Sequence, residues 1–194
     1  MVIDSGTIDT MMLLALAQLP ALTTLRAVFM EPDSWAGLSG LAQLRTLQFV
    51  SGREFSAEHL MALQTSLNSL PHLSHLYLTL DCDFRMSVEN PRPPLFLQLP
   101  ALRRLDLCEV RVPSFAFLQH SPLLEELTLK GSEVRSGFAQ PFAEAFEVLR
   151  LHTPLLRSLS FVGVMRLSED QQALLRPPSA MLPQLHTFRW SRWH

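Results

Sequence analysis

Two histidines spaced three residues apart and two cysteines are the residues best suited to chemistry in this sequence. His72 and His75 have a spacing that an α-helix could use to hold a metal ion. The surrounding pattern instead places His75 in a strand and His72 in the turn before it, so the two side chains diverge. Cys82 and Cys108 lack the helix N-terminus or positioned histidine that stabilises a thiolate. We therefore expect no metal site and no reactive cysteine.

Motifs for nucleotide binding and for hydrolysis are also missing. The sequence contains no G-x-S-x-G elbow, no paired-carboxylate motif and no glycine-rich phosphate loop, and it has only 7 glycines in 194 residues. Its 16 basic and 18 acidic residues give a formal net charge of −2, so no overall field favours nucleic acid or an anionic membrane. We predict no catalytic residues, no cofactor, and a partner that is neither nucleic acid nor membrane.

A repeated pattern, Pro-x-Leu-x-x-Leu-x-Leu, must position any functional side chain. It is clearest in LPALRRLDL (99–107), LPHLSHLYL (70–78) and SPLLEELTL (121–129). Four more copies, with substitutions, begin at Pro20, Ala42, Pro154 and Pro183. The seven units follow one another at intervals of 22 to 32 residues, which is the range of a repeat protein.

Each unit predicts the same local structure. Leu-x-Leu is strand alternation, which directs both leucines to one face, and the Leu three positions earlier also points inward. A single unit cannot bury these leucines, so neighbouring units stack and share a core. The proline should end the preceding helix, because it has no N–H and clashes with the previous turn. We predict an α/β solenoid of about seven repeats, with a parallel β-sheet on the concave face and helices and loops on the convex face.

This pattern resembles the leucine-rich repeat (LRR) family over nearly the whole chain. That family usually has Asn or Cys three positions after the second strand leucine, a position that here holds Met30, Gly52, Asp81, Val110, Ser132 and Val164. The variable repeat length is more similar to the irregular, ribonuclease-inhibitor-like repeats of F-box adaptor proteins. The resemblance implies a non-catalytic protein–protein interaction module, such as the substrate-recognition part of an F-box ubiquitin-ligase adaptor. The alternative is a structural or regulatory LRR scaffold or inhibitor with no ligase link.

Several helices are predicted between the strands. Thr7 caps a predicted helix over Ile8 to Gln18, whose apolar run is too short to span a membrane and lacks the basic flank of a signal peptide. Further helices are predicted from residue 56 to 67, from 142 to 151, and after Ser168. Residues 83–94 are irregular and predict a surface loop, with a functional loop as the alternative.

The two ends of the sequence and its cysteines indicate how the protein assembles and in which compartment it is found. We expect residues 1–194 to form a single LRR domain that is a segment of a longer array, since neither end has a polar capping repeat. Phe188, Trp190 and Trp193 lie on or after the last predicted strand, so we expect self-association through this C-terminal end. Cys82 and Cys108 lie at different depths of adjacent repeats, which indicates reduced thiols and a cytoplasmic or nuclear protein.

The concave face is the surface that remains for function. The repeat aligns the outward strand residues into three rows, about 4.8 Å apart from strand to strand. The central row is Arg26, Gln48, Tyr77, Asp106, Thr128, Ser160 and Arg189. One flanking row is Thr24, Thr46, His75, Arg104, Glu126, Ser158 and Thr187, and the other is Val28, Val50, Thr79, Cys108, Lys130, Val162 and Ser191.

The middle of this face holds the residue types that anchor interfaces. Tyr and Arg most often carry binding energy in protein–protein contacts, and the mixed charge of the face argues against a phosphate-backbone track. The alternative is that Arg104 and Glu126 simply pair across neighbouring strands, which stabilises little. The predicted partner-binding residues are His75, Tyr77, Arg104, Asp106, Glu126 and Thr128.

Overall fold

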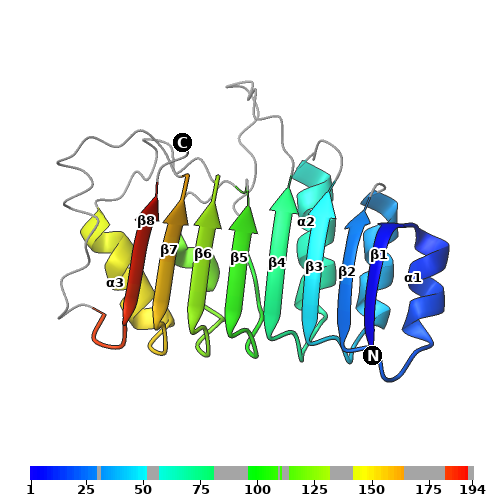
Figure 1. The fold of residues 1–194 in the computed structure, drawn as a ribbon, viewed down its shortest axis with the longest axis horizontal. Coiled ribbons are helices and arrows are strands. Elements are labelled where there is room, and N and C mark those ends of the chain that lie inside the picture. Colours follow the sequence, from blue (N-terminus) through cyan, green and yellow to red (C-terminus); the bar gives the residue numbers. More distant parts are fainter. Residues whose placement is uncertain are drawn as a thin grey trace.

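The computed structural model contains one parallel β-sheet with helices behind it (Figure 1). It describes residues 1–29, 32–51, 57–80, 96–108, 110, 114–131, 142–163 and 182–191. The eight strands among these residues lie in sequence order: β1 (Val2–Ile8), β2 (Thr24–Phe29), β3 (Thr46–Ser51), β4 (His75–Leu80), β5 (Arg104–Cys108), β6 (Glu126–Lys130), β7 (Ser158–Val162) and β8 (Thr187–Ser191). The connecting helices are α1 (Thr10–Ala17), η1 (Pro32–Gly40), α2 (Ala57–Asn68), η2 (Phe115–Leu118) and α3 (Phe142–His152). The predicted α/β solenoid is confirmed.

Strands β2 to β8 are the seven predicted units, and β1 was not predicted. The sequence predicts Thr7 as a helix cap, but Thr7 lies in β1 and pairs with Val28 of β2. The helix instead begins at Thr10, and the cap is Asp9, whose Oδ1 accepts a hydrogen bond from the Met12 N–H at 2.8 Å. The register between β1 and β2 shifts between Asp4 and Thr7, so this strand lacks the regular alternation that would have revealed it.

The prolines have a different role from the one predicted. Helix α1 ends at Ala17 and α2 at Asn68, in each case before the proline is reached. In every unit the proline, or Ala42 in its place, is the second residue of a four-residue turn closed by a hydrogen bond, such as Leu102 N–H to Leu99 C=O at 3.0 Å. The fixed φ of proline suits this position of a β-turn.

A ladder of backbone hydrogen bonds joins each of these turns to the next. The carbonyl of Ser74 accepts from the N–H groups of Arg103 and Arg104 at 2.8 and 3.0 Å. In every other unit except the last, the carbonyl of the equivalent residue accepts two N–H groups of the following unit in the same way. Backbone hydrogen bonds therefore join adjacent repeats before the strands begin.

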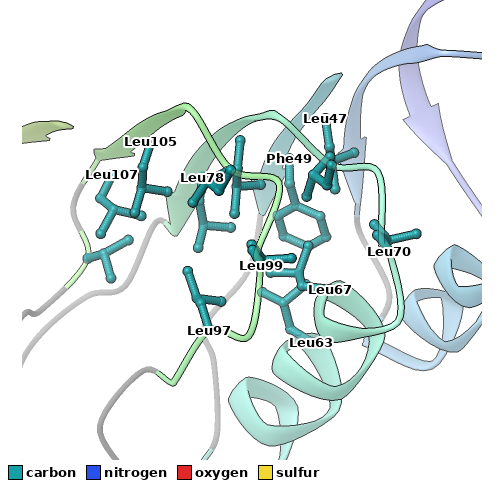
Figure 2. Close-up of a cluster of buried hydrophobic side chains, with 14 of the residues drawn as sticks. Leu47, Phe49, Leu63, Leu67, Leu70, Leu78, Leu97, Leu99, Leu105 and Leu107 are labelled. Atoms are coloured by element: carbon teal, nitrogen blue, oxygen red, sulfur yellow. The ribbon is translucent and has the colours of Figure 1, made fainter. Parts of the chain in front are cut away.

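The core is the continuous stack of leucines that the repeat predicts. Leu76, Leu105 and Leu127 occupy the same position of β4, β5 and β6 and are buried. Figure 2 shows Leu63 and Leu67 of α2 facing the strand leucines and Phe49. The predicted helices over 56–67 and 142–151 correspond to α2 and α3, and Phe146 and Leu149 of α3 are buried as expected.

Repeat length selects the type of connecting helix. The two intervals of 22 residues contain the 3-10 helices η1 and η2, while α2 and α3 lie in intervals of 29 and 32 residues. The 3-10 helix η1 also needs small residues where it packs against helix α1. A Cβ on Gly37 would lie 3.1 Å from the Leu13 Cβ, and one on Gly40 would lie 3.0 Å from the Ala17 Cβ. Both glycines thus allow η1 to pack closely against α1.

Two amide side chains of α2 hold the segment that leads into the next turn. The Gln64 Oε1 accepts from the Phe96 N–H at 2.7 Å, and the Asn68 Oδ1 accepts from the Gln98 N–H, also at 2.7 Å. Because Gln64 and Asn68 are four residues apart, they lie on one side of the helix.

Several predictions concern residues that the structure does not describe. These are Cys82, the 83–94 loop, the helix predicted after Ser168, and Trp193.

Candidate protein-binding surface

The sheet brings all six predicted site residues onto three neighbouring strands. His75 pairs with Arg104 and Arg104 with Glu126, while Tyr77 pairs with Asp106. Asp106 in turn pairs with Thr128. The predicted register is confirmed for all three rows from β2 to β8, and the sheet adds Asp4 of β1 to the start of the central row. We call the six residues on β4 to β6 the central patch.

Arg104 is the hub of the central patch. Its Nε donates a hydrogen bond to Asp106 Oδ2 at 2.8 Å, and its Nη1 lies 3.1 Å from Glu126 Oε2. Its guanidinium carbon lies 5.4 Å from the centroid of the Tyr77 ring, in cation–π geometry. The hydrogen bond to Asp106 is the main cause that raises the pKa of Arg104 above its ordinary value. The guanidinium is therefore held in place by three neighbours.

The expected pairing of Arg104 with Glu126 is present, but it is only part of the arrangement. Asp106 is two residues beyond Arg104 on the same strand, so the two side chains lie on the same face of the sheet. The Asp106 side chain is 20% exposed, against 40% for Arg104 and 49% for Glu126. Arg104 and Asp106 thus form the partly shielded centre of the central patch, and Glu126 forms its rim.

Part of the polar capacity of the central patch remains available to a partner. In the described part of the chain, the Tyr77 hydroxyl and the Arg104 Nη2 have no hydrogen-bond partner. His75 is partly buried, and its Nδ1 lies 2.9 Å from the Ser74 Oγ. A tyrosine hydroxyl and a fixed guanidinium can bind backbone carbonyls or carboxylates of another molecule.

A comparison with known families identifies this architecture. A family model described as "FBD-associated F-box protein At5g56370, LRR repeats" matches residues 32–182. The chain belongs to this leucine-rich repeat family. No curated protein matches the chain.

Membership in the LRR family agrees with a protein-binding surface on the sheet. LRR arrays of this kind are generally non-catalytic interaction modules. Among the described residues no group of three or more His, Cys, Asp or Glu side chains is placed to hold a metal ion. His75 lies in β4, and His72 lies in the turn before it. None of the described helices combines the length and the apolar character needed to cross a membrane.

A fourth row of side chains, at the turn edge of the sheet, was not predicted from the sequence. These residues immediately precede each strand, at the turn edge of the sheet: Thr23, Arg45, Ser74, Arg103, Glu125, Arg157 and His186. Arg103 and Glu125 of this row form an ion pair across neighbouring repeats. The sequence could have predicted this row. In every repeat the first x of Leu-x-x-Leu is the residue before the strand, and the second x is the residue of the flanking row.

Proposed function

We propose that this LRR array binds a protein partner through the concave strand face, with the central patch as the anchor. The observation that supports the proposal is the fixed position of Arg104 between Tyr77, Asp106 and Glu126. Binding costs less when an interface side chain is ordered beforehand, because less side-chain freedom is lost on association. Tyr and Arg are also the residue types most often found as binding hot spots.

We propose in addition that the partner is a substrate of an F-box ubiquitin-ligase adaptor and that the protein acts in the cytoplasm or nucleus. The support is the matching family itself, whose description names an F-box protein. The alternative is a structural or regulatory LRR scaffold or inhibitor with no ligase link. Sequencing the gene on both sides of these residues discriminates the two, because an adaptor requires an F-box-like helical segment in the same protein.

The binding proposal is tested by a double substitution in the central patch. Tyr77→Ala with Arg104→Ala removes the aromatic ring and the guanidinium while leaving the buried leucines intact. We expect loss of partner capture from the native extract with an unchanged circular dichroism spectrum. Both residues are at least partly exposed, so the change removes contacts without opening the core.

A matched control uses the neighbouring strand. Thr46 and Gln48 occupy the same two rows on β3, in register with His75 and Tyr77. Thr46→Ala with Gln48→Ala should leave capture within about twofold of the unmodified chain, since these residues lie outside the central patch, on the next strand. Retained capture by the Tyr77 and Arg104 variant would move the binding surface away from the central patch.

A further inference from the structure

Two arginines near β8 have no ion pair in the described part of the chain. Arg157 immediately precedes β7, and Arg189 lies in the central row on β8. Both side chains are exposed. The nearby carboxylates are already engaged, because Glu125 pairs with Arg103 and Glu126 pairs with Arg104. Within the described residues, no ion pair therefore neutralises the positive charge at this end of the sheet.

The strand surface beside these arginines carries small side chains with hydroxyl groups. Thr128, Ser160 and Arg189 follow one another in the central row, and Ser158 and Thr187 lie beside them. The serine and threonine side chains at 128, 158, 160 and 187 are all partly buried. Short side chains leave the strand surface shallow and offer hydroxyl donors to a bound chain. We call Arg157, Ser158, Ser160, Thr187 and Arg189 the basic end.

The central patch and the basic end differ in charge. Around Arg104, two carboxylates face one guanidinium, so the central patch carries net negative charge. The basic end has two cations and no carboxylate among its five residues. A partner that covers both must place acidic groups over β7 and β8 and cannot be uniformly acidic over β5 and β6.

We infer that the bound partner places an extended, acidic segment of its chain across the basic end. The inference rests on the proposed function and names the partner chemistry at one end of the same surface. The Cα atoms of Arg157 and Arg189 are about 11 Å apart, from one strand spacing and three residues along the strand, which three to four residues of extended chain span. A continuous phosphate backbone fits less well, because Asp106 and Glu126 lie on the neighbouring strands β5 and β6 and Glu125 immediately precedes β6.

The test is fluorescence anisotropy with the full chain and three labelled probes: decaglutamate, decalysine and decathymidylate. We expect decaglutamate to bind, and the binding to weaken as salt is raised, because the contacts are exposed ion pairs. Arg157→Glu with Arg189→Glu should weaken decaglutamate binding by about tenfold or more, since each reversal replaces an attraction by a repulsion. Arg157→Lys with Arg189→Lys should stay within about threefold.

The matched control is Arg45→Glu. Arg45 occupies the same turn-edge position as Arg157, is exposed, and has no ion pair in the part of the chain that the structure describes. An equal loss with Arg45→Glu would overturn the inference by showing general charge attraction. Tighter binding of decathymidylate than of decaglutamate would favour nucleic acid and overturn it as well, as would preferential binding of decalysine.

Two double variants distinguish a failure of this inference from a failure of the proposed function. If partner capture is lost with the Tyr77 and Arg104 variant but kept with the Arg157 and Arg189 reversals, the concave face binds and the acidic segment does not exist. If capture survives both double variants, the concave face itself is not the binding surface.

Discussion

Ser121 offers a sharp test of how the turn positions stabilise the array. It precedes the turn proline, at a position held by leucine in five of the seven units and by Thr153 in another. Ser121 is completely buried, and its Oγ has no hydrogen-bond partner among the described residues. Thr153 is also buried, but its Oγ1 donates to the Leu149 carbonyl at 2.7 Å. Removing each hydroxyl should therefore have opposite effects.

The magnitudes follow from the environment of each hydroxyl. A buried hydroxyl without a partner costs about 1–3 kcal/mol of desolvation. Ser121→Ala recovers this cost and loses a few van der Waals contacts worth ~0.1–0.2 kcal/mol each. The net expectation is a gain of about 1 kcal/mol in the free energy of unfolding. Thr153→Val removes a satisfied hydrogen bond, so it should cost about 0.5–1.5 kcal/mol.

Urea unfolding followed by circular dichroism measures both changes. The two midpoints should move in opposite directions, with unchanged slopes, because neither substitution alters the surface exposed on unfolding. A gain of about 1 kcal/mol corresponds to a rise of roughly 2–4 °C in melting temperature for a chain of this size. Destabilisation by Ser121→Ala as large as that by Thr153→Val would refute the reasoning, since it would mean that the Ser121 hydroxyl is satisfied.

Three further predictions concern the core, one helix and the last strand. Leu105→Ala should cost about 2–5 kcal/mol, because it opens a cavity between Leu76 and Leu127; a melting temperature equal to that of the unmodified chain would contradict the stacking. The hydrogen bond from Arg150 lowers the pKa of Glu147 below its ordinary value of 4.5. A group whose pKa is lowered by folding stabilises the folded state above its unfolded value and loses that effect as the pH falls through the folded value. Glu147→Gln should thus slightly lower the melting temperature at neutral pH, and the difference should vanish well below pH 4.5; a constant difference would exclude this ion pair as its cause. Finally, β8 pairs only with β7 among the described strands, so we expect self-association through its outer edge. Sedimentation at rising concentration should show a growing sedimentation coefficient, and a monomer throughout would contradict it.

The sheet and its three rows could be predicted from the sequence because they depend on one short pattern. Leu-x-x-Leu-x-Leu sets the register, and a register that buried Arg104 or Asp106 instead of Leu105 would be prohibitively costly. Strand β1 could not be found in this way. It lacks the pattern, and its register shift interrupts the alternation on which strand prediction depends.

The central patch could also be predicted only in part from the sequence. Its residues and their neighbours across strands follow from the register, including the Arg104–Glu126 pair. The hydrogen bond between Arg104 and Asp106 depends on side-chain rotamers within one strand, which the repeat does not determine. The amide contacts of Gln64 and Asn68 were missed for a related reason, since they join α2 to a segment about 30 residues further along.

The sequential strand order has a consequence for how the array responds to force. Pulling its two ends apart loads the inter-strand hydrogen bonds along their own direction, and each pair of neighbouring strands carries the full load in series. Bonds loaded in this way open one repeat at a time, beginning at an end strand. Each step releases 22 to 32 residues, or roughly 75–110 Å of extended chain at about 3.4 Å per residue. We therefore expect the array to lengthen stepwise under load while the repeats that are still folded keep their surface.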